Sequence, residues 1–417
     1  MSSGGRTGTG TFLEWPYARS MNRTYDVIVV GSGPAGACAA WRLAQAGVAV
    51  AVLEKAVLPR YKTCGGGIVG RAMQALPLDV CHAVEQDCHI AQLNFPPAGL
   101  SFTTHRPTPI VSMTMRDQFD FAILSASQAA GAAVHEHCAV ENVSFHDDFV
   151  TLVTSAGSMS AKFIVAADGA LSTVARIIGP ADGRVLIPAI EYEVTVTHDR
   201  LDRFHGTARF DFGLLPQGYA WAFPKNDHLS IGVLSMAQRG SDLKQAMAHY
   251  LDLIGCGSVT KVERHGFVIP IRPRRGPFID KRILLVGDAA GFADPVTGEG
   301  ISFAIQSGLL AAQALIDGKL EEESIRNTYS GSVAETILPE LQRGRVLARL
   351  LYDFPRMRSW AFAQQGQRLC EAVTDIMAGK RQYRDLRFKP QTLFRLLSPK
   401  WFRNSVHRLA RPRDDQT

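Results

Sequence analysis

The fold of this chain is decided by the stretch Tyr25-Asp26-Val27-Ile28-Val29-Val30-Gly31-Ser32-Gly33-Pro34-Ala35-Gly36. Its apolar, β-branched first half predicts a buried strand, and the Ala-rich residues that follow predict a helix that ends near Gly47. A second apolar run, from Val48 to Leu53, predicts another strand and ends at the acidic Glu54. This order of strand, glycine turn, helix and strand predicts a βαβ unit and an α/β fold.

The glycines and the acidic residue of this unit are typical of a dinucleotide site. Gly31 allows a tight turn, Gly33 lets a pyrophosphate approach the backbone, and Gly36 lets the helix pack closely on the strand. The free N–H groups at the start of the helix favour phosphate, and Glu54 is placed to accept hydrogen bonds from a ribose. The predicted contacts in this unit are Gly31, Gly33, Pro34, Ala35, Gly36, Glu54 and Lys55.

Motifs further along the chain favour FAD over NAD as the dinucleotide. A predicted strand, Arg282 to Val286, leads into Gly287-Asp288, which would place a carboxylate near the ribityl chain of FAD. Arg116 is the first residue of a predicted helix, from which it can reach a phosphate or a ribityl oxygen. The alternative is an exposed arginine at the start of a helix. The predicted FAD contacts in these segments are Arg116, Val140, Asp168, Gly169, Asp288, Gly298, Gly300 and Ile301.

Together these motifs resemble the flavoprotein group typified by para-hydroxybenzoate hydroxylase. The segments Pro59-Arg-Tyr-Lys-Thr-Cys-Gly-Gly-Gly67 and Tyr219-Ala-Trp-Ala-Phe-Pro224 narrow the resemblance to the geranylgeranyl reductase family. The resemblance spans about Tyr25 to Leu350. It implies a Rossmann-like FAD-binding domain, an inserted mixed β-sheet substrate domain and a helical C-terminal region. It also implies FAD-dependent saturation of C=C bonds in a polyprenyl lipid, quinone or pigment precursor, with NAD(P)H or ferredoxin as the electron donor.

The same resemblance suggests which residues face the substrate. It places Cys64, Gly65 and Gly66 beside the flavin, with Cys64 as a proton donor or a steric wall at the double bond. Tyr219 and Trp221 alternate along a predicted strand and therefore share one face, where they would line an apolar site or act on the substrate. The alternatives are a small buried thiol at Cys64 and an ordinary core stripe on the strand.

The resemblance also predicts how the chain is divided between domains. The FAD-binding domain is expected in three parts and the substrate domain in two. The expected segments are a disordered tail (1–23), FAD-binding parts (24–80, 113–182 and 277–318), substrate parts (81–112 and 183–276), a helical region (319–379) and a basic amphipathic segment (380–417).

Charge is distributed unevenly along the 417 residues, whose formal net charge is +6. The segment 380–417 holds eleven basic residues and three acidic ones, so it carries +8 and the remainder of the chain carries −2. Aromatic and leucine residues lie between these charges, a pattern that suits an anionic membrane surface. A helical tail packed on the body of the protein fits the same pattern, and no nucleic-acid fold accompanies it.

Targeting signals are not evident in the sequence. No run reaches the roughly 18 apolar residues of a spanning helix, and the first 23 residues lack the apolar region of a signal peptide. Met21 is an alternative start. The seven cysteines are scattered without a C-x-x-C pair, which favours reduced thiols and argues against a metal cluster. We therefore expect a cytoplasmic protein, with contact at the inner face of the membrane through residues 380–417.

Other functions remain open on the same fold. One is a flavin-dependent monooxygenase or halogenase acting on an aromatic substrate. Another is an electron-transfer flavoprotein of the FixC type, which passes electrons to quinone. A prenyl-binding escort protein is a non-enzymatic alternative, and the complete FAD motifs argue against it.

Overall fold

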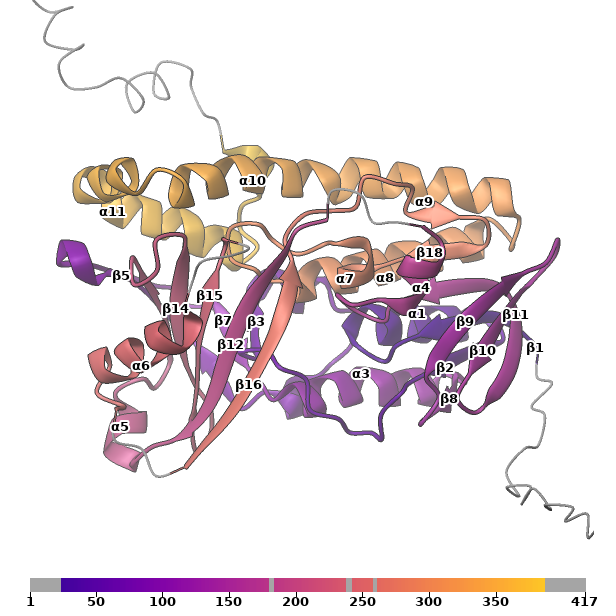
Figure 1. Cartoon of the computed structure of the whole chain (residues 1–417), viewed down its shortest axis with the longest axis horizontal. Coiled ribbons are helices and arrows are strands. Elements are labelled where there is room, and N and C mark those ends of the chain that lie inside the picture. Colours follow the sequence, from indigo (N-terminus) through magenta and orange to yellow (C-terminus); the bar gives the residue numbers. More distant parts are fainter. Residues whose placement is uncertain (1–23, 180–183, 238–241, 258–260, 387–417) are drawn as a thin grey trace, which may run out of the picture.

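The computed structural model describes residues 24–179, 184–237, 242–257 and 261–386, which form two large sheets surrounded by helices (Figure 1). This arrangement confirms the predicted α/β fold, with a Rossmann-like part, an inserted mixed sheet and helices toward the C-terminal end. The predicted disordered tail (1–23) and most of the basic segment (387–417) lie outside the described residues.

The first sheet contains the predicted βαβ unit. Its strands are β1 (Thr24–Val30), β2 (Val50–Leu53), β8 (Ala133–His135), β9 (Val140–Phe145), β10 (Val150–Thr154), β11 (Gly157–Ala166), β17 (Ile279–Asp280) and β18 (Ile283–Leu285). The order β18-β11-β1-β2-β8 is parallel throughout, whereas β17, β9 and β10 are attached by antiparallel pairing. Burial on both faces explains the continuous apolar runs of β1 and β2.

Small residues bring the first helix close to its neighbours. Helix α1 (Pro34–Gln45) packs against α3 (Arg116–Ala129) and α8 (Ile301–Asp317). A Cβ at Gly308 of α8 would lie 2.1 Å from the carbonyl oxygen of Ala35, so this crossing requires glycine. Helix α1 starts at Pro34, earlier than the Ala-rich run alone suggests, because proline is well suited to the first helical position.

The second sheet supplies the other half of the molecule. Its order is β16-β12-β15-β14-β13-β5-β6. The strands are β5 (Ile90–Phe95), β6 (Leu100–His105), β12 (Leu186–Thr195), β13 (Thr207–Phe212), β14 (Gly218–Pro224), β15 (Leu229–Ser235) and β16 (Lys261–Pro270). All pairs are antiparallel except β13 with β5. A third, small sheet joins β3 (Gly67–Val69), β7 (Val111–Met113) and β4 (Gln86–Cys88).

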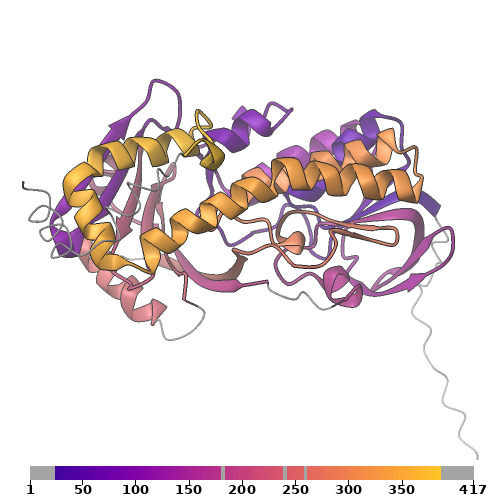
Figure 2. The ribbon, with the colours of Figure 1, turned by 90° about the horizontal axis from the view of Figure 1, so that it is seen from above.

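Helices cover the sheets and connect the two halves. The remaining ones are α2 (Gly70–Ala75), α4 (Thr173–Ile177), α5 (His198–Asp202), α6 (Leu243–Leu253), α7 (Gly287–Ala290), α9 (Glu322–Thr336), α10 (Leu338–Tyr352) and α11 (Pro355–Met377). Short 3₁₀ helices are η1 (Cys81–Ala83), η2 (Pro96–Ala98) and η3 (Tyr383–Asp385). Figure 2 shows α9 and α10 running from the first sheet toward the second, where α11 packs on β6.

Candidate active site

A cavity of about 650 Å³ is lined by both halves of the molecule. The ends of β1, β2 and β11 border one side, and the inward face of the second sheet borders the other. Ligands of open α/β sheets usually bind at such strand ends. All predicted site residues except Gly36 line it: Gly31, Gly33, Pro34, Ala35, Glu54, Lys55, Cys64, Gly65, Gly66, Arg116, Val140, Asp168, Gly169, Tyr219, Trp221, Asp288, Gly298, Gly300 and Ile301.

In the glycine turn after β1, the backbone is open at Gly33 and closely packed at Gly31 and Gly36. Gly31 has a φ of +102°, and a Cβ there would lie 2.5 Å from the carbonyl oxygen of Ala167. A Cβ at Gly36 would lie 2.0 Å from the Gly31 carbonyl, so Gly36 serves helix packing rather than the cavity wall. The nearest atom to a Cβ at Gly33 is Nη2 of Arg60, 3.8 Å away. Gly33 therefore leaves room for a ligand at the uncapped start of α1.

Glu54 is buried at the end of β2, as the sequence predicts. Its Oε2 accepts hydrogen bonds from Ser32 Oγ at 2.6 Å and from the Ser32 amide at 3.2 Å, and it lies 3.2 Å from Nε of Arg60. Burial alone would raise the pKa of Glu54, but these hydrogen bonds and the Arg60 charge outweigh burial and lower the pKa. Glu54 is therefore ionised at neutral pH and fixes the turn around Ser32.

Two arginines next to Glu54 share one carboxylate. Arg116 Nε and Nη2 donate to Asp120 at 2.8 Å each, and Arg60 Nη1 lies 3.3 Å from the same group. Burial lowers the pKa of Arg116, but the charge of Asp120 outweighs it and raises the pKa. The charges of the two guanidinium groups are thus balanced by Glu54 and Asp120, and Lys62 is a third basic side chain on the cavity wall.

The two predicted Gly-Asp motifs have different surroundings. Asp168 caps α4, because its carboxylate accepts the amide hydrogens of Thr173 at 2.7 Å and Val174 at 3.2 Å. Asp288 faces the cavity. Its carboxylate accepts no hydrogen bond from the residues that the structure describes. Burial raises the pKa of Asp288, and the charges of Lys62 and Arg116 oppose that shift. The Asp288 carboxylate is thus an acceptor without a donor among the described residues, and it is suited to a ligand hydroxyl.

Two of the three glycines after Cys64 are closely packed by other protein groups. A Cβ at Gly65 would lie 2.6 Å from Nε1 of Trp221, and one at Gly66 would lie 2.0 Å from the Thr114 carbonyl oxygen. Gly66 also has a φ of +64°. Lys225, which is 1% exposed, donates from Nζ to the carbonyls of Gly65 at 3.0 Å and Thr114 at 2.7 Å. The loop is therefore held between the second sheet and this buried lysine.

The inward faces of β13 and β14 form an aromatic wall, defined here as Phe210 of β13 and Tyr219, Trp221 and Phe223 of β14. Ring centroids of neighbours in this group lie 5.4–6.3 Å apart, within the range of favourable aromatic contacts. A Cβ at Gly232 on β15 would lie 1.9 Å from Trp221, so the indole rests on that glycine. All four rings line the cavity, which confirms that Tyr219 and Trp221 share one face.

The hydroxyl of Tyr219 and the thiol of Cys64, both predicted to be catalytic, have defined partners. Tyr219 donates to the carbonyl oxygen of Thr297, and burial raises the pKa of Tyr219 far above its usual range. Cys64 Sγ accepts from the Gly66 amide at 3.4 Å, and the Cys64 amide donates to Oε2 of Glu191 at 2.8 Å. The hydroxyl of Tyr219 therefore positions the 294–300 segment.

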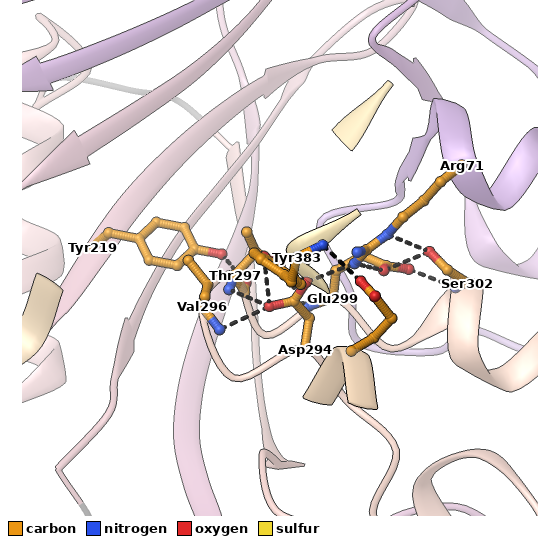
Figure 3. Close-up of polar contacts among 9 residues, drawn as sticks. Arg71, Tyr219, Asp294, Val296, Thr297, Glu299, Ser302 and Tyr383 are labelled. Atoms are coloured by element: carbon orange, nitrogen blue, oxygen red, sulfur yellow. Dashed lines mark hydrogen bonds and ion pairs between the residues drawn. The ribbon is translucent and has the colours of Figure 1, made fainter. Parts of the chain in front are cut away.

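A buried ion-pair cluster connects α2 to that segment (Figure 3). Arg71 Nη2 lies 2.7 Å from Oδ2 of Asp294 and 2.8 Å from Oε2 of Glu299. Tyr383 of η3 donates to Asp294 at 2.9 Å, and Ser302 donates to Glu299 through its amide and its hydroxyl. The cluster fixes the glycines at 298 and 300 that lead into α8.

A second polar cluster, on β12, borders the cavity opposite the flavoprotein motifs. Glu191 is 1% exposed, and its carboxylate also accepts from Ser230 Oγ at 2.6 Å. Burial, followed by the charge of Glu193, raises the pKa of Glu191 to about 7. Tyr61 donates to both carboxylates, and Glu193 forms an ion pair with His228.

Comparison with known proteins gives the family of this chain. A model of an FAD binding domain matches residues 24–206. The chloroplastic geranylgeranyl diphosphate reductase of Oryza sativa subsp. japonica is 30% identical over 357 residues, which are 79% of this chain and 76% of that protein. Digeranylgeranylglycerophospholipid reductase 1 of Methanopyrus kandleri is 30% identical over 364 residues, 78% of this chain and 93% of that protein. The chain belongs to the geranylgeranyl reductase family.

This reductase-family member is an FAD-dependent oxidoreductase. The menaquinone reductase of Mycolicibacterium smegmatis is 28% identical to it over 373 residues, 81% of this chain and 86% of that protein. A geranylgeranyl bacteriochlorophyll reductase-like protein from Thermoplasma acidophilum shares the fold, with a TM-score of 0.70, 22% identity, and coverage of 93% of this chain and 99% of that chain. The flavin-dependent brominase Bmp2 also shares the fold, with a TM-score of 0.68, 20% identity and the same coverage of both chains.

The cavity of the family member fits FAD on three structural observations. Gly33 and the uncapped start of α1 leave room for a diphosphate, and Arg60, whose Nη2 would lie 3.8 Å from a Cβ at Gly33, supplies a positive charge beside it. Glu54 lies where its carboxylate could accept a hydrogen bond from a ribose hydroxyl. The unpaired carboxylate of Asp288 would accept a hydrogen bond from a ribityl hydroxyl.

Sequence reasoning missed several residues of this site in the reductase-family member. They converge from distant segments: Arg71, Glu191, Glu193, Lys225, His228 and Asp294. One signal was present, because Glu191 and Glu193 alternate within an otherwise apolar strand. Two acidic residues on one face of a buried strand indicate a functional cluster.

Among the helices at residues 24–179, 184–237, 242–257 and 261–386, none is long and apolar enough to cross a membrane. Over the same ranges, no group of three His, Cys, Asp or Glu side chains is arranged to hold a metal ion.

Proposed function

We propose that this enzyme saturates C=C bonds in the polyprenyl chain of a lipid, a quinone or a pigment precursor. The aromatic wall carries the proposal, because four rings beside the FAD motifs form an apolar surface suited to an isoprenoid chain. The names of its relatives support a prenyl substrate, since they include geranylgeranyl diphosphate, digeranylgeranylglycerophospholipid and menaquinone reductases.

Reduction of an unactivated alkene requires a hydride and a proton, and bound reduced FAD supplies the hydride. The residues of the chain orient the alkene and exclude water. Trp221 and Phe223 would hold the prenyl chain from one side, since their rings are less than 10% exposed and face the cavity. The Cys64 loop is fixed against this wall by Lys225, so both sides of the site are preorganised.

An aromatic hydroxylase or halogenase is distinguished from a prenyl reductase by the reaction it catalyses and not by its fold. The brominase and the reductase-like protein have nearly the same fold similarity to this chain, so the fold does not separate them. An electron-transfer flavoprotein of the FixC type would pass electrons to a quinone ring without saturating the prenyl chain.

The function is tested by reducing the bound flavin anaerobically and mixing the enzyme separately with geranylgeranyl lipids, menaquinone and small aromatics. The proposal predicts reoxidation by a prenyl compound, whose product carries two more hydrogens for each saturated bond. Quinol formation with an unchanged prenyl chain would support the FixC-like alternative. Reaction that needs oxygen or halide, and an aromatic substrate, would support the hydroxylase or halogenase.

We also propose that the basic segment 380–417 contacts an anionic membrane that holds the substrate. Its charge of +8 and its interleaved aromatic residues support this proposal. Vesicles containing anionic lipid should bind the full chain more tightly than a chain truncated after Leu386, which keeps Tyr383 and its hydrogen bond to Asp294. Equal binding of both chains would contradict membrane contact through this segment.

A further inference from the structure

A chain of titratable side chains leads from the cavity wall to solvent. It starts at Glu191 and Glu193, which are two residues apart on β12 and therefore lie on the same face. Tyr61 bridges them, because its hydroxyl lies 3.4 Å from Oε2 of Glu191 and 3.2 Å from Oε1 of Glu193. Nε2 of His228 lies 3.1 Å from Oε2 of Glu193.

The outer end of this chain reaches water. His228 lies in the turn between β14 and β15, and its side chain is 16% exposed. Its Nδ1 lies 2.6 Å from Oδ1 of Asp227, whose side chain is 88% exposed. Glu191 at the inner end is 1% exposed and borders the cavity. The path therefore joins a buried carboxyl group to the surface through groups that can each gain and release a proton.

Other charged and polar groups face Glu191 from each neighbouring element. Lys225 follows β14, Ser230 lies on β15, and the Cys64 amide comes from the loop after β2. His265, directly opposite Glu191 on β16, stacks on the Tyr61 ring with 4.2 Å between centroids. These contacts hold the carboxyl group in place.

Protonation of the path is balanced near neutral pH. Burial and then the charge of Glu193 raise the pKa of Glu191 to about 7. Burial lowers the pKa of His228, but the neighbouring carboxylates of Glu193 and Asp227 outweigh it, so the pKa of His228 is raised. Glu191 can therefore exchange a proton near neutral pH, as a general acid requires. Burial and the two carboxylates raise the pKa of Tyr61 far above its usual range, so its hydroxyl passes a proton on only as it receives another.

We infer that Glu191 supplies the proton for alkene reduction, and that Tyr61, Glu193 and His228 carry its replacement from solvent. This inference rests on the proposed prenyl reduction. The Glu191 O–H bond breaks as a C–H bond forms at the alkene carbon that does not receive the hydride. The hydride would bring its own electron pair to one alkene carbon, and the π electron pair forms the C–H bond to the proton at the other. The carboxylate left on Glu191 takes a proton from Tyr61, which is reprotonated through Glu193 and His228.

The other candidate donors lack such a connection. The Tyr219 hydroxyl donates to the Thr297 carbonyl, an acceptor that has no proton to pass on. Cys64 Sγ accepts from the Gly66 amide, which does not exchange protons on the timescale of turnover. Among these three described groups, only the carboxyl group of Glu191 is linked to solvent by close contacts between titratable side chains.

The first test needs no substrate. Infrared spectra of the FAD-loaded enzyme are recorded across neutral pH, and the carbonyl band of a buried carboxylic acid is followed. The inference predicts a band that titrates near neutral pH, disappears in Glu191→Gln and persists in Glu263→Gln. Glu263 is a matched control, because it lies opposite Glu193 on β16 but its side chain is 56% exposed. Absence of any such band in the wild-type enzyme would overturn the inference, whatever the substrate.

The second test measures reoxidation of the reduced enzyme by a geranylgeranyl lipid that the wild-type enzyme accepts. Glu191→Gln should slow reoxidation about 100-fold, with FAD and lipid affinity unchanged, as loss of a general acid does. Tyr61→Phe keeps the ring on His265 and every other Glu191 contact, so it should fold even if Glu191→Gln does not. Tyr61→Phe and His228→Gln should each slow reoxidation about tenfold, because reprotonation then limits the rate.

The outcomes separate this inference from the proposed function. Wild-type reoxidation by prenyl lipids, together with rates in Glu191→Gln and Tyr61→Phe equal to that of Glu263→Gln, would overturn the proton path and leave the proposed function intact. If no prenyl lipid reoxidises the wild-type enzyme, the proposed function fails and the role of Glu191 in prenyl reduction fails with it. In that case the infrared titration still shows whether Glu191 holds a proton at neutral pH.

Discussion

Replacing Arg71 with methionine tests how far the buried ion-pair cluster of Figure 3 stabilises the site. Arg71 holds Asp294 at 2.7 Å and Glu299 at 2.8 Å, and these carboxylates are 0% and 9% exposed. Methionine keeps much of the side-chain length but removes the positive charge. The substitution therefore leaves two carboxylates close together, buried and without their shared cation.

The expected loss of unfolding free energy follows from the burial of this pair. Removing one partner of a buried ion pair typically costs about 3–5 kcal/mol. We expect the lower end, about 3 kcal/mol, because 18% of the Arg71 side chain still contacts water. Adding Asp294→Asn and Glu299→Gln to the same variant should recover part of the loss, since no unpaired charge then remains buried.

Urea unfolding of the FAD-loaded enzyme measures the change, with Arg106→Met as a matched control. Arg106 is 19% exposed, almost the same as Arg71, but its partner Asp375 keeps 17% of its side chain in water. We expect Arg106→Met to cost about 1 kcal/mol or less. Equal unfolding free energies for the two variants would refute the reasoning, because the burial of the carboxylates would then not matter.

Three further predictions concern the cavity wall. Burial raises the pKa of Glu191 to about 7, so this carboxyl group should make the wild-type enzyme lose stability as pH rises from about 4.5 through 7. Denaturant midpoints across this range should fall less in Glu191→Gln than in the wild-type enzyme, and the loss that remains belongs to other groups with raised pKa values, such as His228 and Asp288. Gly232→Ala should cost about 1–3 kcal/mol and weaken lipid binding, because the new Cβ displaces the Trp221 indole, whose fluorescence should change. Tyr219→Phe should cost about 1 kcal/mol by leaving the Thr297 carbonyl unpaired, whereas complete loss of reduction would identify Tyr219 as a proton donor instead.

The fold was largely predictable because its deciding signals are local. The strand of β1, the glycine turn and α1 are contiguous, so spacing alone places Gly31, Gly33 and Glu54 in one unit. The ends of α1 were harder to predict. Its first residue is Pro34, and proline starts a helix without adding to the apolar pattern.

The polar part of the site could not be read from the sequence in the same way. Tyr61, Glu191 and His228 are brought together by strand register and by the path of the loop after β2. Arg71 and Asp294 are 223 positions apart and meet only when α2 packs beside α8. Packing adds a reason for glycine that the sequence did not reveal: Gly65 and Gly66, predicted to lie beside the flavin, line the cavity and are also closely approached by Trp221 and the Thr114 carbonyl.

Reduction of prenyl double bonds by the FAD-loaded enzyme is the function we propose for this cavity. Its most direct test is to mix the anaerobically reduced enzyme with a geranylgeranyl lipid and to determine the mass of the product as the flavin reoxidises. We predict reoxidation without oxygen and a product heavier by two hydrogens for each bond saturated. Flavin that stays reduced with every prenyl lipid, and reoxidises only with oxygen while an aromatic compound is hydroxylated or halogenated, would contradict the claim.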